Sequence, residues 1–108
     1  MRSIDLSLYP VTFRTPQGEQ TQDYDVKASL RGVLLSQQLQ LDAASLLRNY
    51  EIAQKVGQAD GQLLIEEADY QVLSEALGRL RGFTENDVPF IRRIKDAPQV
   101  PVELKVVK

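Results

Sequence analysis

Two side chains that carry much of protein chemistry are missing from this 108-residue chain, which contains no cysteine and no histidine. Without cysteine, the chain has no disulfides, thiolate metal sites, iron–sulfur clusters or cysteine nucleophiles. Without histidine, it lacks the usual general base near neutral pH and the commonest transition-metal ligand. Zinc enzymes and Ser-His-Asp hydrolases are therefore excluded. These absences predict a protein that is not an enzyme and uses no cofactor.

Long apolar runs are missing as well. No segment approaches the length of a membrane span, and Asp5 with two serines interrupts the N-terminal apolar residues, so that no secretory signal is recognisable. The formal net charge of −2 argues against indiscriminate attraction to phosphate. We expect a soluble protein with no membrane contact.

The composition is that of a folded chain. Hydrophobic residues make up 43% of it and charged residues 26%, which suits one compact core and is too little for two. No polar linker or internal repeat divides the chain. We predict a single domain over residues 1–108.

Alternating apolar residues predict strands at the N-terminus. Between Ile4 and Phe13, apolar residues alternate with polar ones. Pro10 within this stretch implies an edge strand or a bulge. Thr15-Pro16-Gln17-Gly18 is a turn sequence, and residues 20–26 return as a second strand. A β-hairpin is the expected result.

Apolar residues at three- and four-residue spacing then predict about four helices. A short one starts near Lys27, and a longer one follows an N-cap at Asp42. Its predicted buried stripe includes Tyr50 and consists of Ala43, Leu46, Leu47, Tyr50, Ala53 and Val56. Residues 68–80 form the third helix. Thr84 and Asp87 resemble a capping box for the fourth.

The C-terminus reads as a closing strand over residues 102–107, with Val102, Leu104 and Val106 on one face. The predicted fold is therefore α+β, in which the N-terminal hairpin and this strand form one small antiparallel sheet packed by the helices.

The stretch Asp60-Gly61-Gln62-Leu63 raises the question of a calcium loop. An EF-hand register with Gly61 at its sixth position fits Asp60, Leu63 and Glu67 but puts Val56 where the first carboxylate belongs. A turn followed by acids at a helix N-terminus explains the same residues. We expect no metal.

Two sets of residues are candidates for an interface. The first is basic and comprises Arg79, Arg81, Arg92 and Arg93. It predicts either a solvated, salt-bridged surface or a nucleic-acid contact, although Glu85 and Asp87 lie between the arginines. The second is apolar and comprises Tyr70, Leu39 and Leu41, which would mark a docking patch if they are exposed.

The segments "YPVTFRTPQGEQTQDYDVKASLRGVLLS", "LLRNYEIAQKV" and "DGQLLIEEADYQVLSEAL" together resemble small uncharacterised proteins encoded by tailed phages and prophages. The resemblance implies a role in virion structure or assembly, or inhibition of a host system, in either case through protein contacts. It also implies a location in the bacterial cytoplasm or in the virion.

The sequence therefore predicts a small, non-catalytic protein-interaction module that binds a protein partner or a second copy of itself. A nucleic-acid-binding regulator is the alternative.

Overall fold

A computed structural model describes residues 1–100 of the chain. Its elements follow one another as β1 (Arg2–Asp5), β2 (Tyr9–Thr15), β3 (Gly18–Tyr24), α1 (Val26–Leu34), the 3₁₀ turn η1 (Gln37–Leu39), α2 (Ala43–Gln58), β4 (Gln62–Ile65), α3 (Glu67–Arg79), the 3₁₀ turn η2 (Glu85–Asp87) and α4 (Val88–Lys95). This arrangement confirms the predicted α+β class. No helix within residues 1–100 is long and apolar enough to cross a membrane.

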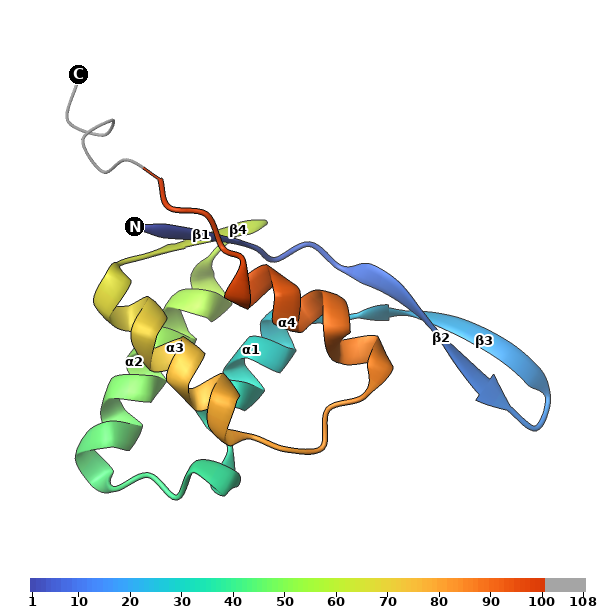
Figure 1. Ribbon diagram of the computed structural model, residues 1–108, viewed down its shortest axis with the longest axis horizontal. Helices are drawn as coiled ribbons and strands as arrows, with labels where there is room; N and C mark the ends of the chain where they lie inside the picture. The colour runs from blue at the N-terminus through green and yellow to red at the C-terminus, as the bar shows by residue number, and fades with distance from the viewer. Residues whose placement is uncertain (101–108) are drawn as a thin grey trace.

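Within residues 1–100 the strands form two separate two-stranded ribbons, which differs from the predicted single sheet. β1 pairs antiparallel with β4, with Ile4 opposite Leu63, whereas among the described residues β2 pairs only with β3. The reason is that Ile4 and Leu63 both point into the core, which aligns two short strands far apart in sequence. Figure 1 shows the four α-helices on one side of the β1–β4 ribbon and the β2–β3 hairpin extending away from them.

The predicted closing strand at 102–107 lies outside the described residues. The segment that precedes it runs beside β1: the Ser3 amide donates to the Pro98 carbonyl at 3.0 Å, and the Val100 amide donates to the Met1 carbonyl at 2.8 Å.

Two helical segments begin at the side-chain caps that the sequence predicts. Asp42 accepts a hydrogen bond from the Ser45 amide at 2.8 Å, which confirms it as the N-cap of α2. Asp87 accepts from the Thr84 amide at 2.8 Å, and the predicted capping box is present. That box opens η2, and α4 continues from it with Pro89 in its first turn, where a missing N–H costs nothing.

The core collects apolar side chains from all four α-helices and from the β1–β4 ribbon. Its largest fully buried members include Phe90, Leu30, Leu73 and Ile94. A polar residue, Asn49 of α2, is also fully buried, and its amide donates to the Leu34 carbonyl at the end of α1 at 2.9 Å. This bond satisfies a carbonyl that the helix end leaves without an intrahelical partner.

Asn49 explains why the predicted stripe of α2 is wrong in part. α2 buries Asn49, Ile52, Ala53 and Val56, and this rotation turns Leu46, Leu47 and Tyr50 to the surface. Tyr50 is 45% exposed and does not belong to the core.

We predict that Asn49→Ala lowers the free energy of unfolding by about 1–3 kcal/mol, because it leaves the buried Leu34 carbonyl without a donor. Urea unfolding followed by circular dichroism measures this loss. Gln58→Ala, at the exposed end of the same helix, is the control and should change stability by less than about 0.5 kcal/mol. Equal effects of the two substitutions would contradict the role given to Asn49.

Candidate functional site

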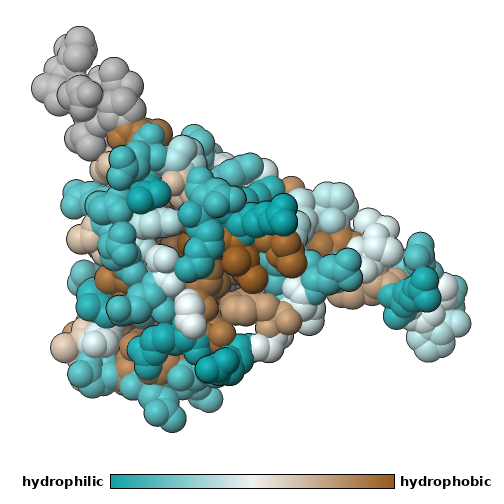
Figure 2. Space-filling view, in the orientation of Figure 1, coloured by the Kyte–Doolittle hydropathy of each residue, from teal (hydrophilic) through white to brown (hydrophobic). Residues whose placement is uncertain are grey.

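The most conspicuous surface feature is the β2–β3 hairpin, which we call the arm (residues 9–24). Figure 2 shows it as a finger that leaves the body of the molecule, with polar residues at its tip. β3 has no fully buried residue, and Phe13 of β2 is 39% exposed. The turn residues Pro16 and Gln17 join the strands, and Gly18 takes a φ of +116°, as the sequence predicts for a glycine at this turn.

The base of the arm is fixed to α4 by aromatic and polar contacts. The rings of Tyr9 and Tyr24 stack with their centroids 4.7 Å apart, and Tyr24 also contacts Phe90. The Tyr24 hydroxyl donates to the Asp87 carboxylate at 2.5 Å, and the Tyr9 hydroxyl donates to the Asn86 carbonyl at 2.7 Å. These contacts set the direction in which the arm leaves the body.

Arg93 of α4 holds the chain just before the arm. Its guanidinium donates to the carbonyls of Asp5 (3.1 Å) and Ser7 (2.6 Å) and lies 5.2 Å from the centre of the Tyr9 ring. Asp5 is 3.9 Å away as an ion-pair partner. Hydrogen bonding from the Ser7 amide lowers the pKa of the Asp5 carboxyl, so that it stays ionised near neutral pH.

We call the contacts of Tyr9, Tyr24 and Asp87 at the base of the arm the anchor. Its surroundings disfavour ionisation of the two phenols. Burial and, after it, the hydrogen bond to Asp87 raise the pKa of Tyr24 well above its ordinary value. Burial likewise raises the pKa of Tyr9. Both hydroxyls therefore stay protonated and able to donate at any physiological pH.

A groove runs beside β2 at the base of the arm. It has a volume of about 370 Å³, and its lining combines one strand with the start of α4: Tyr9, Pro10, Val11, Thr12, Glu85, Asn86 and Pro89. Glu85 is exposed in this groove and makes no ion pair within residues 1–100.

A second exposed apolar region lies on α2, and we call it the α2 surface (Leu46, Leu47 and Tyr50). Leu47 is 65% exposed, the largest value among the exposed large hydrophobic residues. Next to it is a hollow of about 280 Å³, which Leu46 lines together with Leu35 and Leu41. Clustered apolar side chains of this kind on a small domain are typical of a docking surface.

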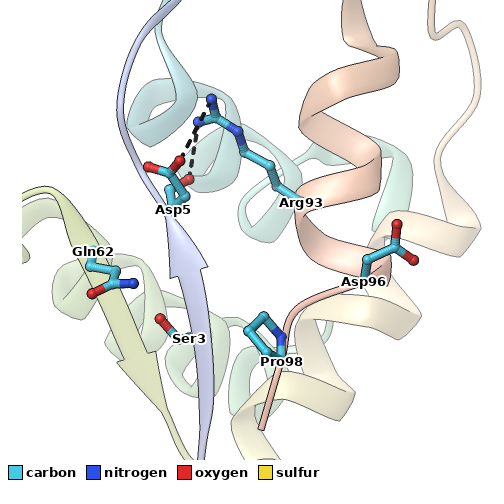
Figure 3. Close-up of a pocket in the computed structure, with 6 residues that line it drawn as sticks. All are labelled: Ser3, Asp5, Gln62, Arg93, Asp96 and Pro98. Atoms are coloured by element: carbon cyan, nitrogen blue, oxygen red, sulfur yellow. Dashed lines mark hydrogen bonds and ion pairs between the residues drawn. The ribbon is translucent and has the colours of Figure 1, made fainter. Parts of the chain in front are cut away.

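A third hollow, of about 220 Å³, lies between the β1–β4 ribbon and the end of α4 (Figure 3). Its polar side chains are Ser3, Asp5, Gln62, Arg93 and Asp96. Figure 3 shows Arg93 turned toward Asp5, whereas Asp96 points away from it. The Ser3 hydroxyl is buried and has no hydrogen-bond partner within residues 1–100, so no base is placed to activate it as a nucleophile.

The structure does not bring the predicted apolar interface residues together on the surface. Tyr70 is only 5% exposed, and its hydroxyl donates to the Ile94 carbonyl at 2.7 Å, which ties α3 to the end of α4. Leu39 is 1% exposed because η1 folds it into the core, and Leu41 packs partly against the same core. Tyr70 and Leu39 are therefore buried, and the condition under which they would mark a docking patch is not met.

The four candidate arginines serve different purposes. Arg79 donates to the Leu39 carbonyl at 2.6 Å, and Arg93 holds the segment before the arm, so both act as internal ties. Arg81 and Arg92 are exposed. Arg79 is exposed as well, but its guanidinium binds the Leu39 carbonyl.

The segment around Asp60 and Gly61 folds as a turn followed by acids at a helix N-terminus, which is the alternative to a calcium loop. Gly61 has a φ of +77°, as in a turn, and Gln62–Ile65 forms β4. Glu67, at the first turn of α3, accepts from Arg2 at 3.0 Å, and this bond lowers its pKa. Within residues 1–100, no three acidic side chains are grouped so that they could hold a metal ion.

The sequence alone does not distinguish the exposed apolar residues of α2 from its buried ones. Leu46, Leu47 and Tyr50 continue the spacing of Ala53 and Val56, and this pattern predicts that they are buried. The turn sequence predicts that the arm is a hairpin, but it does not indicate how much of the arm the helices leave uncovered. The anchor between Tyr24 and Asp87 joins residues 63 positions apart and was not foreseen.

Comparison of the chain with protein-family models, with curated proteins and with solved structures gives no match in any of the three.

We predict an alkaline loss of stability that depends on the anchor. Because the pKa of Tyr24 is raised in the folded state, its stabilising effect is complete below about pH 10, where a phenol in the unfolded chain ionises, and is lost as the pH rises further. The urea midpoint of the natural protein should therefore begin to fall at about pH 10 and continue to fall as the pH rises above it.

Tyr24→Phe should show a smaller fall over this range, whereas Tyr50→Phe, which removes a phenol far from the arm, should keep the full fall. The same fall in both variants would show that Tyr24 is not responsible.

Proposed function

We propose that this protein is a non-catalytic protein-interaction module whose contacts are made by the arm and by the α2 surface. The observation that carries the proposal is the arm itself. Among residues 1–100, its two seven-residue strands pair only with each other. Such a two-stranded ribbon is marginal in water unless something packs against it.

The two ends of the arm differ in a way that suits binding. Its base is locked by the stacked tyrosines and by Asp87, so its direction is fixed before a partner arrives. Its outer part keeps Phe13 and most polar side chains in solvent. Preorganisation of this kind lowers the entropic cost of association.

The chemistry of the hollows supports a role without catalysis. The Asp5 carboxyl, with its lowered pKa, is a poor proton donor near pH 7, and the Ser3 hydroxyl has no neighbouring base among the residues described. The polar groups in the hollow of Figure 3 instead hold the body together through Arg93.

The process in which the contacts are made is proposed from sequence resemblance. The similarity to small proteins of tailed phages and prophages favours an assembly, structural or accessory role for a virion. The protein would then act in the cytoplasm of the bacterial host or within the particle. Inhibition of a host system would use the same two surfaces and differs only in the identity of the partner.

Site-specific photo-crosslinking in the source cell tests the proposal. A benzoylphenylalanine replacing Phe13 in the arm or Leu47 in the α2 surface should give discrete heavier adducts on irradiation. The same probe at Gln58, which is exposed at the end of α2, is the control and should give none. Adducts at Gln58 equal to those at both test positions, or no adduct at any position, would contradict an interaction module.

Binding to nucleic acid is the alternative function, and the exposed Arg81 and Arg92 are the side chains that would carry it. Phosphate contacts are strongest at low salt, so titration of labelled DNA and RNA at low ionic strength is the decisive measurement. We expect no saturable binding. Saturable binding that is lost in a combined Arg81→Glu, Arg92→Glu variant would favour this alternative.

A further inference from the structure

We propose that two copies of the chain associate by pairing their arms edge to edge, β2 against β2, antiparallel, with Thr12 opposite Thr12 of the second copy. This inference rests on the proposed function and names the partner of the arm as a second copy of the chain. A two-fold axis would pass beside Thr12, and the two hairpins would merge into one four-stranded ribbon.

The pairing edge follows from the register of the hairpin. Thr15 and Gly18 close a two-residue turn and form a hydrogen-bonded pair, and such pairs alternate along an antiparallel ladder. Pro10, Thr12 and Arg14 therefore direct their backbone groups away from β3. Pro10 fits this assignment, since it has no N–H to donate. Within residues 1–100, no backbone hydrogen bond outside the hairpin reaches this edge.

The side chains of β2 are compatible with a copy of themselves. Val11 and Phe13 share one face of the strand, because successive side chains alternate. With Thr12 at the axis, Val11 lies opposite Phe13 of the second copy, and the reverse pair follows by symmetry. Aromatic and β-branched residues in such cross-strand pairs are mutually stabilising. Pairing would cover the exposed part of Phe13.

The groove beside β2 supplies the place for the second arm. In this register Arg14 of the second copy lies opposite Pro10, which lines the groove together with Glu85. Neither Arg14 nor Glu85 has an ion-pair partner within residues 1–100. The two-fold pairing brings these opposite charges together twice, once on each side of the axis.

Charge also selects this edge over the alternative one. A two-fold pairing through the outer edge of β3, centred on Thr21, would set Glu19 opposite Asp23 of the second copy, twice. Like charges directly opposite each other destabilise a ladder. A shifted β2 pairing with Phe13 at the axis would bring the two Arg14 side chains close together and move them away from Glu85.

The absence of cysteine makes disulfide trapping clean. Thr12→Cys should form a covalent dimer under mild oxidation, because directly opposite residues in a hydrogen-bonded pair have Cα atoms about 5.5 Å apart, within the range a disulfide spans. Thr21→Cys is the matched control, since Thr21 faces Thr12 across the hairpin on the opposite edge. It should cross-link at least about tenfold more slowly. Circular dichroism of both reduced variants shows that each is folded.

Charge reversal tests the second contact. Arg14→Glu and Glu85→Arg should each weaken self-association about three- to tenfold, as measured by light scattering across a concentration series. The double variant should regain the natural affinity, because the ion pair is restored with its signs exchanged. Double-variant dimers that remain as weak as either single variant would overturn the contact between Arg14 and Glu85.

Several outcomes would overturn the pairing. If Thr21→Cys cross-links as fast as Thr12→Cys, the interface lies elsewhere. If Phe13→Cys cross-links faster than Thr12→Cys, the register with Phe13 at the two-fold axis is the correct one. A protein that stays monomeric at millimolar concentration, with Thr12→Cys untrapped, would refute self-pairing. If the probe at Phe13 still captured a different protein, the proposed function would survive that refutation; if it captured nothing, both would fall.

Discussion

The hydrogen bond between the Tyr24 hydroxyl and the Asp87 carboxylate is the contact on which the arrangement of the molecule depends. Asp87 also caps the turn that opens α4, so one carboxylate joins the base of the arm to the start of a helix. The Tyr9 ring stacks on Tyr24, and the guanidinium of Arg93 lies 5.2 Å from the centre of the Tyr9 ring. Together with the bond from the Tyr9 hydroxyl to the Asn86 carbonyl, this joint fixes the direction of the arm relative to the body.

The body is stabilised by hydrogen bonds in which polar side chains donate to backbone carbonyls of neighbouring elements. Asn49 binds the end of α1, Arg79 binds the Leu39 carbonyl, and Tyr70 binds the end of α4. Arg2 adds a contact with the Ala97 carbonyl and lies 4.3 Å from the centre of the Tyr70 ring. These bonds satisfy carbonyls at chain ends and turns that regular structure leaves open.

Local features of the sequence were sufficient for the helices and the hairpin. Asp42 as an N-cap, Thr84 with Asp87 as a capping box, and the Pro-Gln turn each depend on a few neighbouring residues, and the structure confirms all of them. The pairing of strands was not predictable in the same way. Ile4 could pair with any strand of matching alternation, and only the assembled core selects Leu63.

Which apolar residues are exposed could not be predicted from the sequence for a similar reason. Apolar spacing shows that α2 has an apolar stripe, but the rotation of the helix depends on what lies opposite it. The polar Asn49 is buried because the Leu34 carbonyl needs a donor, and that requirement turns Leu47 and Tyr50 outward. Tyr70 is hidden because α4 offers its hydroxyl a buried acceptor. Neither partner is adjacent in the chain.

The pairing of β1 with β4 has a consequence for the order of folding. Residues 2–5 are synthesised before their partners in 62–65 and before the neighbouring Pro98. The strand pairs of the arm and the contact between α1 and α2 join residues that are close in sequence, whereas the base of the arm needs Asn86 and Asp87. β1 can therefore pair only after β4 and the segment at Pro98 have been made, and the arm takes its fixed direction only after η2 has been made.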